Sequence, residues 1–159
     1  MTALLISACG NNSGKGEDPL GQAFEVVAGG GSDPAATRAL DTKLTGLIGD
    51  LEVAADGVVR LLVTETSGRS IVAISPAGQV QRIKLKTAQR GANQLAVADD
   101  GSLYVSFTGD GGVFHVSATG ELVRVVGNGI RGFTPDGGLA TGRAGATLGI
   151  TVDHQGRLV

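Results

Sequence analysis

The sequence contains little of several residue types, and each shortage excludes a class of protein. One cysteine among 159 residues permits no internal disulfide. Tryptophan is absent and aromatic residues make up 3% of the chain, so the stacking platform of a nucleic-acid-binding surface is missing. Lysine plus arginine number 13 against 15 aspartate plus glutamate, so a basic face for phosphates is not expected. No apolar run approaches the roughly 20 residues of a membrane-spanning helix.

Glycine, by contrast, is abundant. The chain has 27 glycines and a hydrophobic fraction of 42%. This combination is typical of many short apolar strands joined by tight turns. We therefore expect an ordered, strand-rich chain after the first twenty or so residues.

Strand-like apolar runs follow one another around short turns such as Asp56-Gly57 and Pro76-Ala77-Gly78. An Asp-Gly pair between apolar runs favours a hairpin, because both residues tolerate positive φ. The same order of runs then returns once more along the chain. The predicted strands are residues 51–55, 58–64, 71–75 and 79–85, and then 95–98, 102–107, 113–117 and 121–126.

The spacing of the turns gives the period of this repeat. Gly57 and Gly101 are 44 positions apart, and Gly78 and Gly120 are 42 apart. A period in the low forties with four short strands per unit is typical of a propeller blade. Because residues 58–63 are apolar on both faces, neighbouring blades must cover both. We therefore predict an all-β fold, a β-propeller of four-stranded antiparallel blades.

The stretch before the first repeat is predicted to be different. Residues 24–28 indicate an isolated strand that enters a long glycine-containing connection. Within 35–44, apolar residues three or four positions apart predict one or two turns of helix.

Near the N-terminus, Leu5-Ile6-Ser7-Ala8-Cys9 resembles a bacterial lipobox, in which a small residue precedes a cysteine that becomes lipid-modified. On this interpretation residues 1–22 are a truncated signal segment and a flexible tether, and Cys9 is the lipidation site. The protein would then be extracytoplasmic, in the cell envelope, and possess a lipid anchor as its sole membrane contact. The alternative is an ordinary terminus with a small buried thiol.

The sequence also resembles NHL repeats, the blades of a family of usually six-bladed β-propellers. The resemblance covers roughly residues 24–159. It is strongest at Val126-Gly127-Asn128-Gly129, Gly132-Phe133, Asp136-Gly137-Gly138 and Ile150-Thr151-Val152-Asp153. It implies that residues 23–159 are a partial propeller, truncated to about half of a six-bladed ring, with a closing strand, two blades and the start of a third.

Two consequences follow from the resemblance. The family's Asn-His or Asn-Asn pair is replaced by Gly68-Arg69 in one repeat and Asp110-Gly111 in the next, so no ligand contact is transferred to those positions. A half ring leaves strand edges and a blade face exposed, so the isolated chain is expected to aggregate or fold poorly.

No residue pattern predicts catalysis, a cofactor or a metal site. His115 in a strand and His154 in a turn are isolated imidazoles. A packed or surface-facing side chain is favoured over a metal ligand for His115, and a turn role for His154. Four aspartates lie at hairpins, where a carboxylate accepts local backbone hydrogen bonds, and this role is favoured over calcium binding or general-acid chemistry. They are Asp56, Asp99, Asp100 and Asp153.

The long glycine-rich connection after residue 126 is the predicted ligand-contact loop, because propellers usually carry function on loops at one end of the ring. Its candidate contact residues are Asn128, Arg131, Phe133, Asp136 and Arg143. The favoured function is a non-enzymatic NHL-type binding domain of a bacterial cell-envelope protein, with a protein, peptide or glycan ligand and no nucleic-acid partner. The alternative is half of a propeller enzyme of lyase or lactonase type, whose metal or catalytic residues lie in the absent part.

Overall fold

The computed structural model describes residues 3–6, 16–17, 23–87, 91–109, 111–132, 135, 137–145 and 149–159. Over these residues the secondary structure is β-strand, bridge and turn, arranged as two four-stranded sheets and one three-stranded sheet. In the same part of the chain, no helix has the length and apolarity needed to cross a membrane. The all-β prediction is confirmed.

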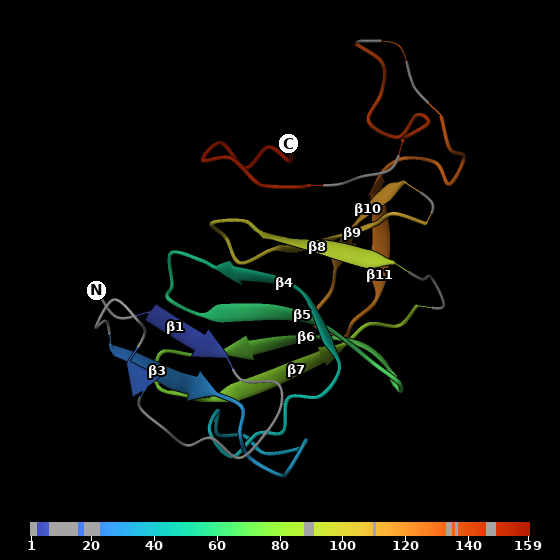
Figure 1. Cartoon of the computed structure of the whole chain (residues 1–159). Coiled ribbons are helices and arrows are strands. Elements are labelled where there is room, and N and C mark those ends of the chain that lie inside the picture. Colours follow the sequence, from blue (N-terminus) through green and yellow to red (C-terminus); the bar gives the residue numbers. More distant parts are fainter. Residues whose placement is uncertain are drawn as a thin grey trace.

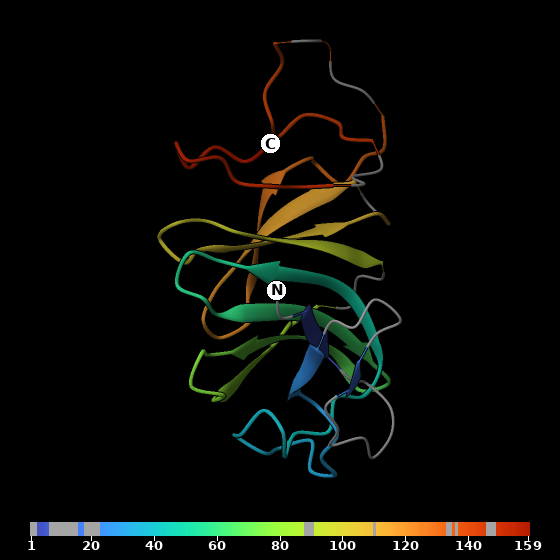
Figure 2. The same cartoon turned by 60° about the vertical axis from the view of Figure 1, so that its left-hand side comes forward.

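Each four-stranded sheet is an antiparallel meander in which sequence neighbours pair. Blade one consists of β4 (Leu47–Val53), β5 (Val59–Glu65), β6 (Gly68–Ile74) and β7 (Val80–Lys84). Blade two consists of β8 (Ala92–Val97), β9 (Leu103–Phe107), β10 (Gly112–Val116) and β11 (Leu122–Val126). The two blades are stacked as successive layers (Figures 1 and 2). All eight predicted strands are present in the predicted order.

The first hairpin turn of each blade uses the same hydrogen bonds. The Asp56 carboxylate accepts from the Val58 N–H at 2.9 Å, and the Asp100 carboxylate accepts from the Ser102 N–H at 2.9 Å. Hydrogen bonds from the Arg60 side chain, and then from Val58, lower the pKa of Asp56. Those from the Ser102 backbone and hydroxyl lower the pKa of Asp100. The predicted turn role of these carboxylates is confirmed.

The largest core lies between the two blades. Leu62 and Ile71 of blade one are fully buried together with Leu95 and Val105 of blade two. Phe107 is also fully buried in this cluster, and burial of such side chains is the main favourable term in folding. The remaining buried members of the cluster are Leu85, Ala92, Leu103, Phe114 and Val116. Blades that are apolar on both faces thus cover one another, as the sequence predicts.

Blade one buries its other face only in part. Leu61, Val63 and Val72 are covered there, in a cluster that also contains residues of the connection 29–46. On the inner strand β4, however, Leu51 is 41% exposed and Val53 is 53% exposed. Their cross-strand partners show that both side chains lie on the same face as Leu61. This strip is an unpartnered continuation of the second core.

Self-association through this strip is expected. The double substitution Leu51→Thr and Val53→Thr places β-branched strand formers at both positions and removes apolar surface, so it should reduce association with little loss of stability. Light scattering across a concentration series measures the effect. The same double change at Val123 and Leu139, which are exposed elsewhere, is the control. Equal association of both variants and the wild type would contradict the expectation.

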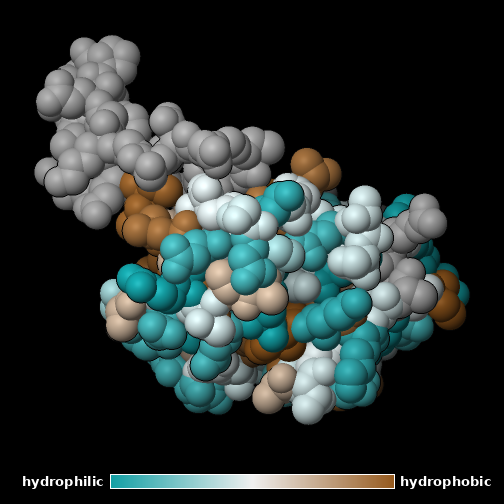
Figure 3. Space-filling view, turned by 90° about the horizontal axis from the view of Figure 1, so that it is seen from below, coloured by the Kyte–Doolittle hydropathy of each residue, from teal (hydrophilic) through white to brown (hydrophobic). Residues whose placement is uncertain are grey.

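Seen from below, the apolar residues lie in separate spots on a mostly polar surface (Figure 3).

The strand predicted at 24–28 is present as β3 (Ala23–Ala28), but it is not isolated. It lies between β1 (Ala3–Ile6), with which it pairs in parallel, and β2 (Gly16–Glu17), with which it pairs antiparallel. The prediction that this strand is isolated is wrong, because residues 3–6 and 16–17 form strands that pair with it. Cys9 lies outside the described residues, so its lipidation stays a prediction.

The helix predicted within 35–44 is wrong, since these residues form turns and isolated bridges. Apart from short turn bonds such as that from the Asp41 N–H to the Arg38 carbonyl at 3.2 Å, their backbone groups bond to the edge of blade one. The Val80 N–H donates to the Thr37 carbonyl at 2.7 Å, and the Ala39 N–H donates to the Gly78 carbonyl at 2.8 Å. Tertiary pairing therefore overrides the weak helical spacing.

The last residues form a short hairpin beyond blade two (Figures 1 and 2). Thr151 and Val159 exchange backbone hydrogen bonds of 2.9 and 2.8 Å. Asp153 closes the turn by accepting from the Arg157 and Gln155 N–H groups, each at 2.9 Å. The Arg157 backbone and side-chain hydrogen bonds, followed by that from Gln155, lower the pKa of Asp153. The strand and turn expected at the start of a third repeat thus appear as a hairpin.

Candidate functional site

The connection after β11 packs against the β9–β10 turn at one end of blade two. The Gly127 N–H donates to the Ala140 carbonyl at 2.8 Å, which closes the connection into a loop. Arg131 and Ala144 form a parallel bridge within it. A Cβ on Gly111, in the neighbouring turn, would lie 2.6 Å from the Ala144 carbonyl oxygen. Only glycine permits this approach of the two backbones, so the turn and the loop form one unit.

Arg131 fixes the loop to that turn with its side chain. Its Nη2 donates to the Thr108 carbonyl at 2.8 Å, and its Nε donates to the Gly109 carbonyl at 3.2 Å. A guanidinium has five N–H donors, so this anchoring leaves Nη1 without a partner among the described residues. The group is exposed and held in one orientation.

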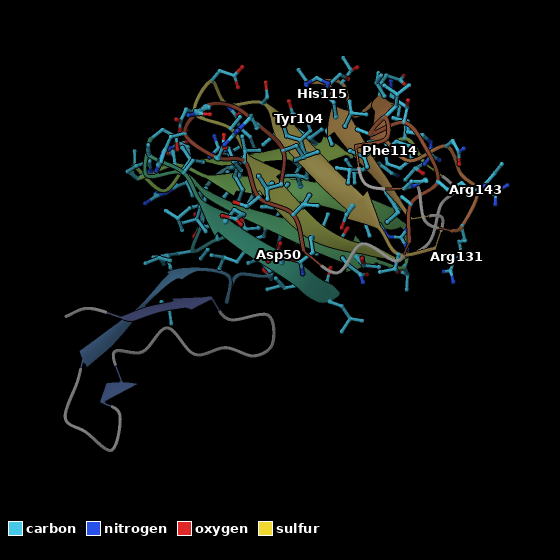
Figure 4. All side chains as sticks on the ribbon, turned by 90° about the horizontal axis from the view of Figure 1, so that it is seen from above. Asp50, Tyr104, Phe114, His115, Arg131 and Arg143 are labelled. Carbon is cyan, nitrogen blue, oxygen red and sulfur yellow. The ribbon has the colours of Figure 1, made fainter. Side chains whose placement is uncertain are left out.

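Arg143 directly precedes Ala144, the residue that is bridged to Arg131. Its Cδ is 3.1 Å from the position that a Cβ on Gly132 would occupy, so its aliphatic stem packs across that glycine. Arg143 is exposed. Both arginines project from the same end of the molecule (Figure 4). The structure therefore brings two exposed guanidinium groups onto one loop.

The other predicted contact residues have different outcomes. Asn128 is exposed, but its Oδ1 accepts from the Ile130 N–H at 2.9 Å, which makes it a turn residue. Phe133 and Asp136 lie outside the described residues, and their predicted roles stay predictions. Of the five candidates, the structure brings Arg131 and Arg143 together.

Asp50 is a conspicuous polar residue that the sequence reasoning missed. The first strand was predicted to begin at residue 51, but β4 begins at Leu47 and includes Asp50. Its Oδ2 accepts from the Leu95 N–H at 2.8 Å and therefore joins the inner strands of the two blades. Asp50 is labelled on β4 in Figure 4. A carboxylate just after Gly49, at a β-bulge, was the signal available in the sequence.

The two histidines, His115 and His154, lie in different parts of the fold. His115 is half-buried in β10, where its ring contacts Tyr104 edge-on with a centroid distance of 5.6 Å. His154 is exposed in the last hairpin, and Asp99 is exposed in the β8–β9 turn. Among the residues that the structure describes, no group of three or more histidine, cysteine, aspartate or glutamate side chains could hold a metal ion. Of the two positions predicted for His115, packed or surface-facing, the structure shows a half-buried ring packed on Tyr104.

The three turn aspartates predict a dependence of stability on pH. Their pKa values are lowered in the folded chain, so the stability they contribute is present at neutral pH and is lost as the pH falls below about 4. Replacing Asp56, Asp100 and Asp153 with asparagine should reduce the loss of unfolding free energy at acid pH, measured by urea unfolding at a series of pH values. Burial, and then the Asp50 charge, raise the pKa of Glu52, which acts in the opposite direction. Glu52 is unchanged in the triple variant, so the difference between variant and wild type isolates the turns. If the triple variant lost as much stability at acid pH as the wild type, the turn aspartates would not be the cause of that loss.

Four-stranded meanders that stack face to face, with connecting loops at one end, define the fold of a β-propeller. No protein-family model matches the chain, and the search of curated proteins finds no match. Among solved structures, a candidate gluconolactonase is 22% identical with a TM-score of 0.50, over 89% of this chain and 47% of that one. This similarity supports the propeller fold.

Two further solved structures have lower scores. A gluconolactonase from Xanthomonas campestris is 24% identical with a TM-score of 0.45, over 89% of this chain and 46% of that one. An inactive virginiamycin B lyase from Staphylococcus aureus with quinupristin is 13% identical with a TM-score of 0.44, over 68% of this chain and 32% of that one. The chain thus spans less than half the length of each of these three solved structures.

Proposed function

We propose that this chain is the ligand-binding part of a β-propeller of the NHL type, without catalytic activity of its own, and that the loop 127–145 contacts the ligand. The observation that supports this is the pair Arg131 and Arg143, two exposed guanidinium groups on one bridged loop. The proposed ligand carries an acidic group and is a peptide or a glycan.

The geometry of Arg131 supports an acidic ligand. The carbonyl oxygens of Thr108 and Gly109 hold its guanidinium in place, which lowers the entropy that a ligand contact would cost. Guanidinium groups recognise planar carboxylates through paired N–H donors. Arg143, which precedes the bridged residue Ala144, supplies a second positive charge. An acidic peptide or a uronic-acid glycan has the matching chemistry.

Fluorescence anisotropy with labelled hexaglutamate and hexagalacturonate tests the proposal. Wild-type chain should bind at least one of these probes and should not bind hexaglutamine. Arg131→Gln and Arg143→Gln should each weaken binding about tenfold, because each removes one charge-assisted contact of about 1.5 kcal/mol. Added salt should weaken binding further, since both groups are exposed.

Arg38→Gln is the matched control. Arg38 is also an exposed arginine, with 79% of its side chain accessible and an exposed ion pair to Asp41 at 3.8 Å, but it lies in the connection before blade one. Its loss should leave probe binding unchanged. Equal weakening by Arg38→Gln would mean that the probes respond to overall charge, and binding of hexaglutamine would remove the acidic-ligand proposal.

The second candidate is part of a propeller enzyme. It is favoured by the similarity to a candidate gluconolactonase over 89% of the chain. A pH-stat assay with gluconolactone, with and without added divalent cations, separates the two candidates. The binding proposal expects no hydrolysis above the uncatalysed rate, whereas turnover that EDTA abolishes would favour the enzyme.

The cell-envelope location is proposed on the Leu5–Cys9 resemblance alone. Metabolic labelling with a palmitate analogue in a bacterial host, with Cys9→Ala as the control, would test it. Labelling that Cys9→Ala does not reduce would contradict lipidation at this residue.

A further inference from the structure

A small hollow lies on blade one, on the face turned towards blade two. Its volume is about 210 Å³. Three adjacent strands or strand ends each contribute two residues, two positions apart, so that all six side chains point the same way. The lining residues are Val58, Arg60, Ala73, Ser75, Gln79 and Gln81.

The hollow exists because Ala73 is small. In the register of blade one, Ala73 stands directly between Arg60 and Gln81. Longer side chains on both neighbouring strands therefore surround a position that is filled only by a methyl group. Ala73 forms the floor, and polar groups form the walls.

Blade two shows the same position filled. Its register places His115 between Tyr104 and Val123. His115 is the equivalent of Ala73, Tyr104 of Arg60, and Val123 of Gln81. The Tyr104 and His115 rings occupy that place in contact with each other. The two repeats therefore differ at this position: blade one has a methyl group where blade two has an imidazole ring.

Arg60 is the charged residue among those that line the hollow, and it is paired with a carboxylate. The Arg60 side chain is only 11% exposed, and its Nη2 donates to Asp56 Oδ2 at 2.8 Å. Its Nη1 donates to Asp56 Oδ1 at 3.2 Å, so the pair is bidentate. The Asp56 carboxylate neutralises this guanidinium, and Glu52 stands directly opposite Arg60 on β4, so the hollow offers an anion no uncompensated positive charge.

Donors and acceptors alternate around the rim. The Gln79 and Gln81 amides each offer both kinds of group, and neither has a hydrogen-bond partner for its side chain among the described residues. Ser75 Oγ accepts from the Gln79 N–H at 3.1 Å, which leaves the hydroxyl hydrogen to donate outward. Hydroxyl groups of a ligand, which both donate and accept, match this arrangement.

We propose that this hollow binds an uncharged polyol of the size of a single sugar ring, separately from the loop 127–145. The two sites lie at opposite ends of the blades. Val58, Ser75 and Gln79 belong to the end with the Asp-Gly and Ser-Pro turns, whereas the loop packs on the β9–β10 turn at the other end. Occupation of one site leaves the other open.

Titration of the ¹⁵N-labelled chain with myo-inositol, followed by NMR, tests the proposal. The Gln79 and Gln81 side-chain amide signals should shift and saturate with a dissociation constant on the order of 1 mM, as expected for about twelve ligand heavy atoms. Sodium gluconate, which is similar in size but charged, should bind at least tenfold more weakly.

Two variants identify the hollow. Ala73→His introduces the residue that blade two has at this position, so the blade can accommodate it, and binding should be lost. Gln81→Leu removes one exposed amide without touching the core, and should weaken binding at least fivefold. His115→Ala is the control in blade two and should bind like the wild type.

The outcomes are separable. If Ala73→His loses binding and keeps the wild-type backbone NMR spectrum outside blade one, the result supports the proposal. If that spectrum changes, the affinity of Gln81→Leu is the test instead. Absence of saturable shifts in the wild type, unchanged affinity in Gln81→Leu, or stronger binding of gluconate than of myo-inositol would each overturn the proposal.

Discussion

Replacing Phe107 with alanine is expected to lower the free energy of unfolding by about 3–5 kcal/mol, the usual cost of removing a buried aromatic ring. Phe107 is fully buried between the blades, and its ring contacts Phe114 edge-on at a centroid distance of 5.3 Å. Urea unfolding, followed by circular dichroism, measures the loss. Because single domains of this size have a net stability of about 5–15 kcal/mol, the variant should be close to unfolding.

Two comparisons make this expectation specific. Phe107→Leu keeps an apolar side chain at the site and should cost less than half as much. Val123→Ala removes a side chain that is 59% exposed on blade two and should cost less than about 0.5 kcal/mol. If Phe107→Ala were as mild as Val123→Ala, the blades would not share the core described above.

The second large effect is expected at Gly120, in the β10–β11 turn. Gly120 has a φ of 81°, and a Cβ there would lie 2.9 Å from the Lys84 carbonyl carbon of blade one. The Lys86 N–H donates to the Gly120 carbonyl at 2.8 Å, so this turn holds the second blade against the first. Gly120→Ala should therefore cost the strain of a left-handed residue, about 1–2 kcal/mol, and a further 1–3 kcal/mol for displacing the backbone.

The repeat supplies a matched control. Gly78 occupies the same position in blade one with a φ of 75°, but no atom lies within 4 Å of its missing Cβ. Gly78→Ala should cost only the strain. Chemical unfolding of both variants measures the difference, which isolates the contact between the blades. Equal losses would show that the turn of blade two does not press on Lys84.

Local turn chemistry explains why the blades could be predicted from the sequence. The turns at Asp56 and Asp100 satisfy their own backbone groups, and each strand then pairs with its neighbours in the chain. The register follows from the turns. Strand ends were predicted less well, since β4 continues through Gly49 by a bulge that joins two blades.

Contacts between distant segments were not predictable in the same way. Residues 35–44 have a helical spacing, but their backbone bonds to the β7 edge, more than thirty positions away for the pair Thr37 and Val80. The anchoring of Arg131 on Thr108 and Gly109 likewise depends on how the connection folds back. The sequence indicated the loop and its arginines. Their arrangement, and the hollow above Ala73, became visible only in the folded chain.

The central functional claim concerns the loop 127–145, and mapping a ligand onto the chain tests it most directly. The ¹⁵N-labelled chain is titrated with whichever acidic probe it binds, and backbone and arginine side-chain signals are followed by NMR. The account expects saturable shifts at Arg131, Arg143 and the adjoining turn at Thr108 and Gly109, and none with the neutral probe. Saturable shifts confined to other parts of the chain, or equal shifts with the neutral probe, would contradict it.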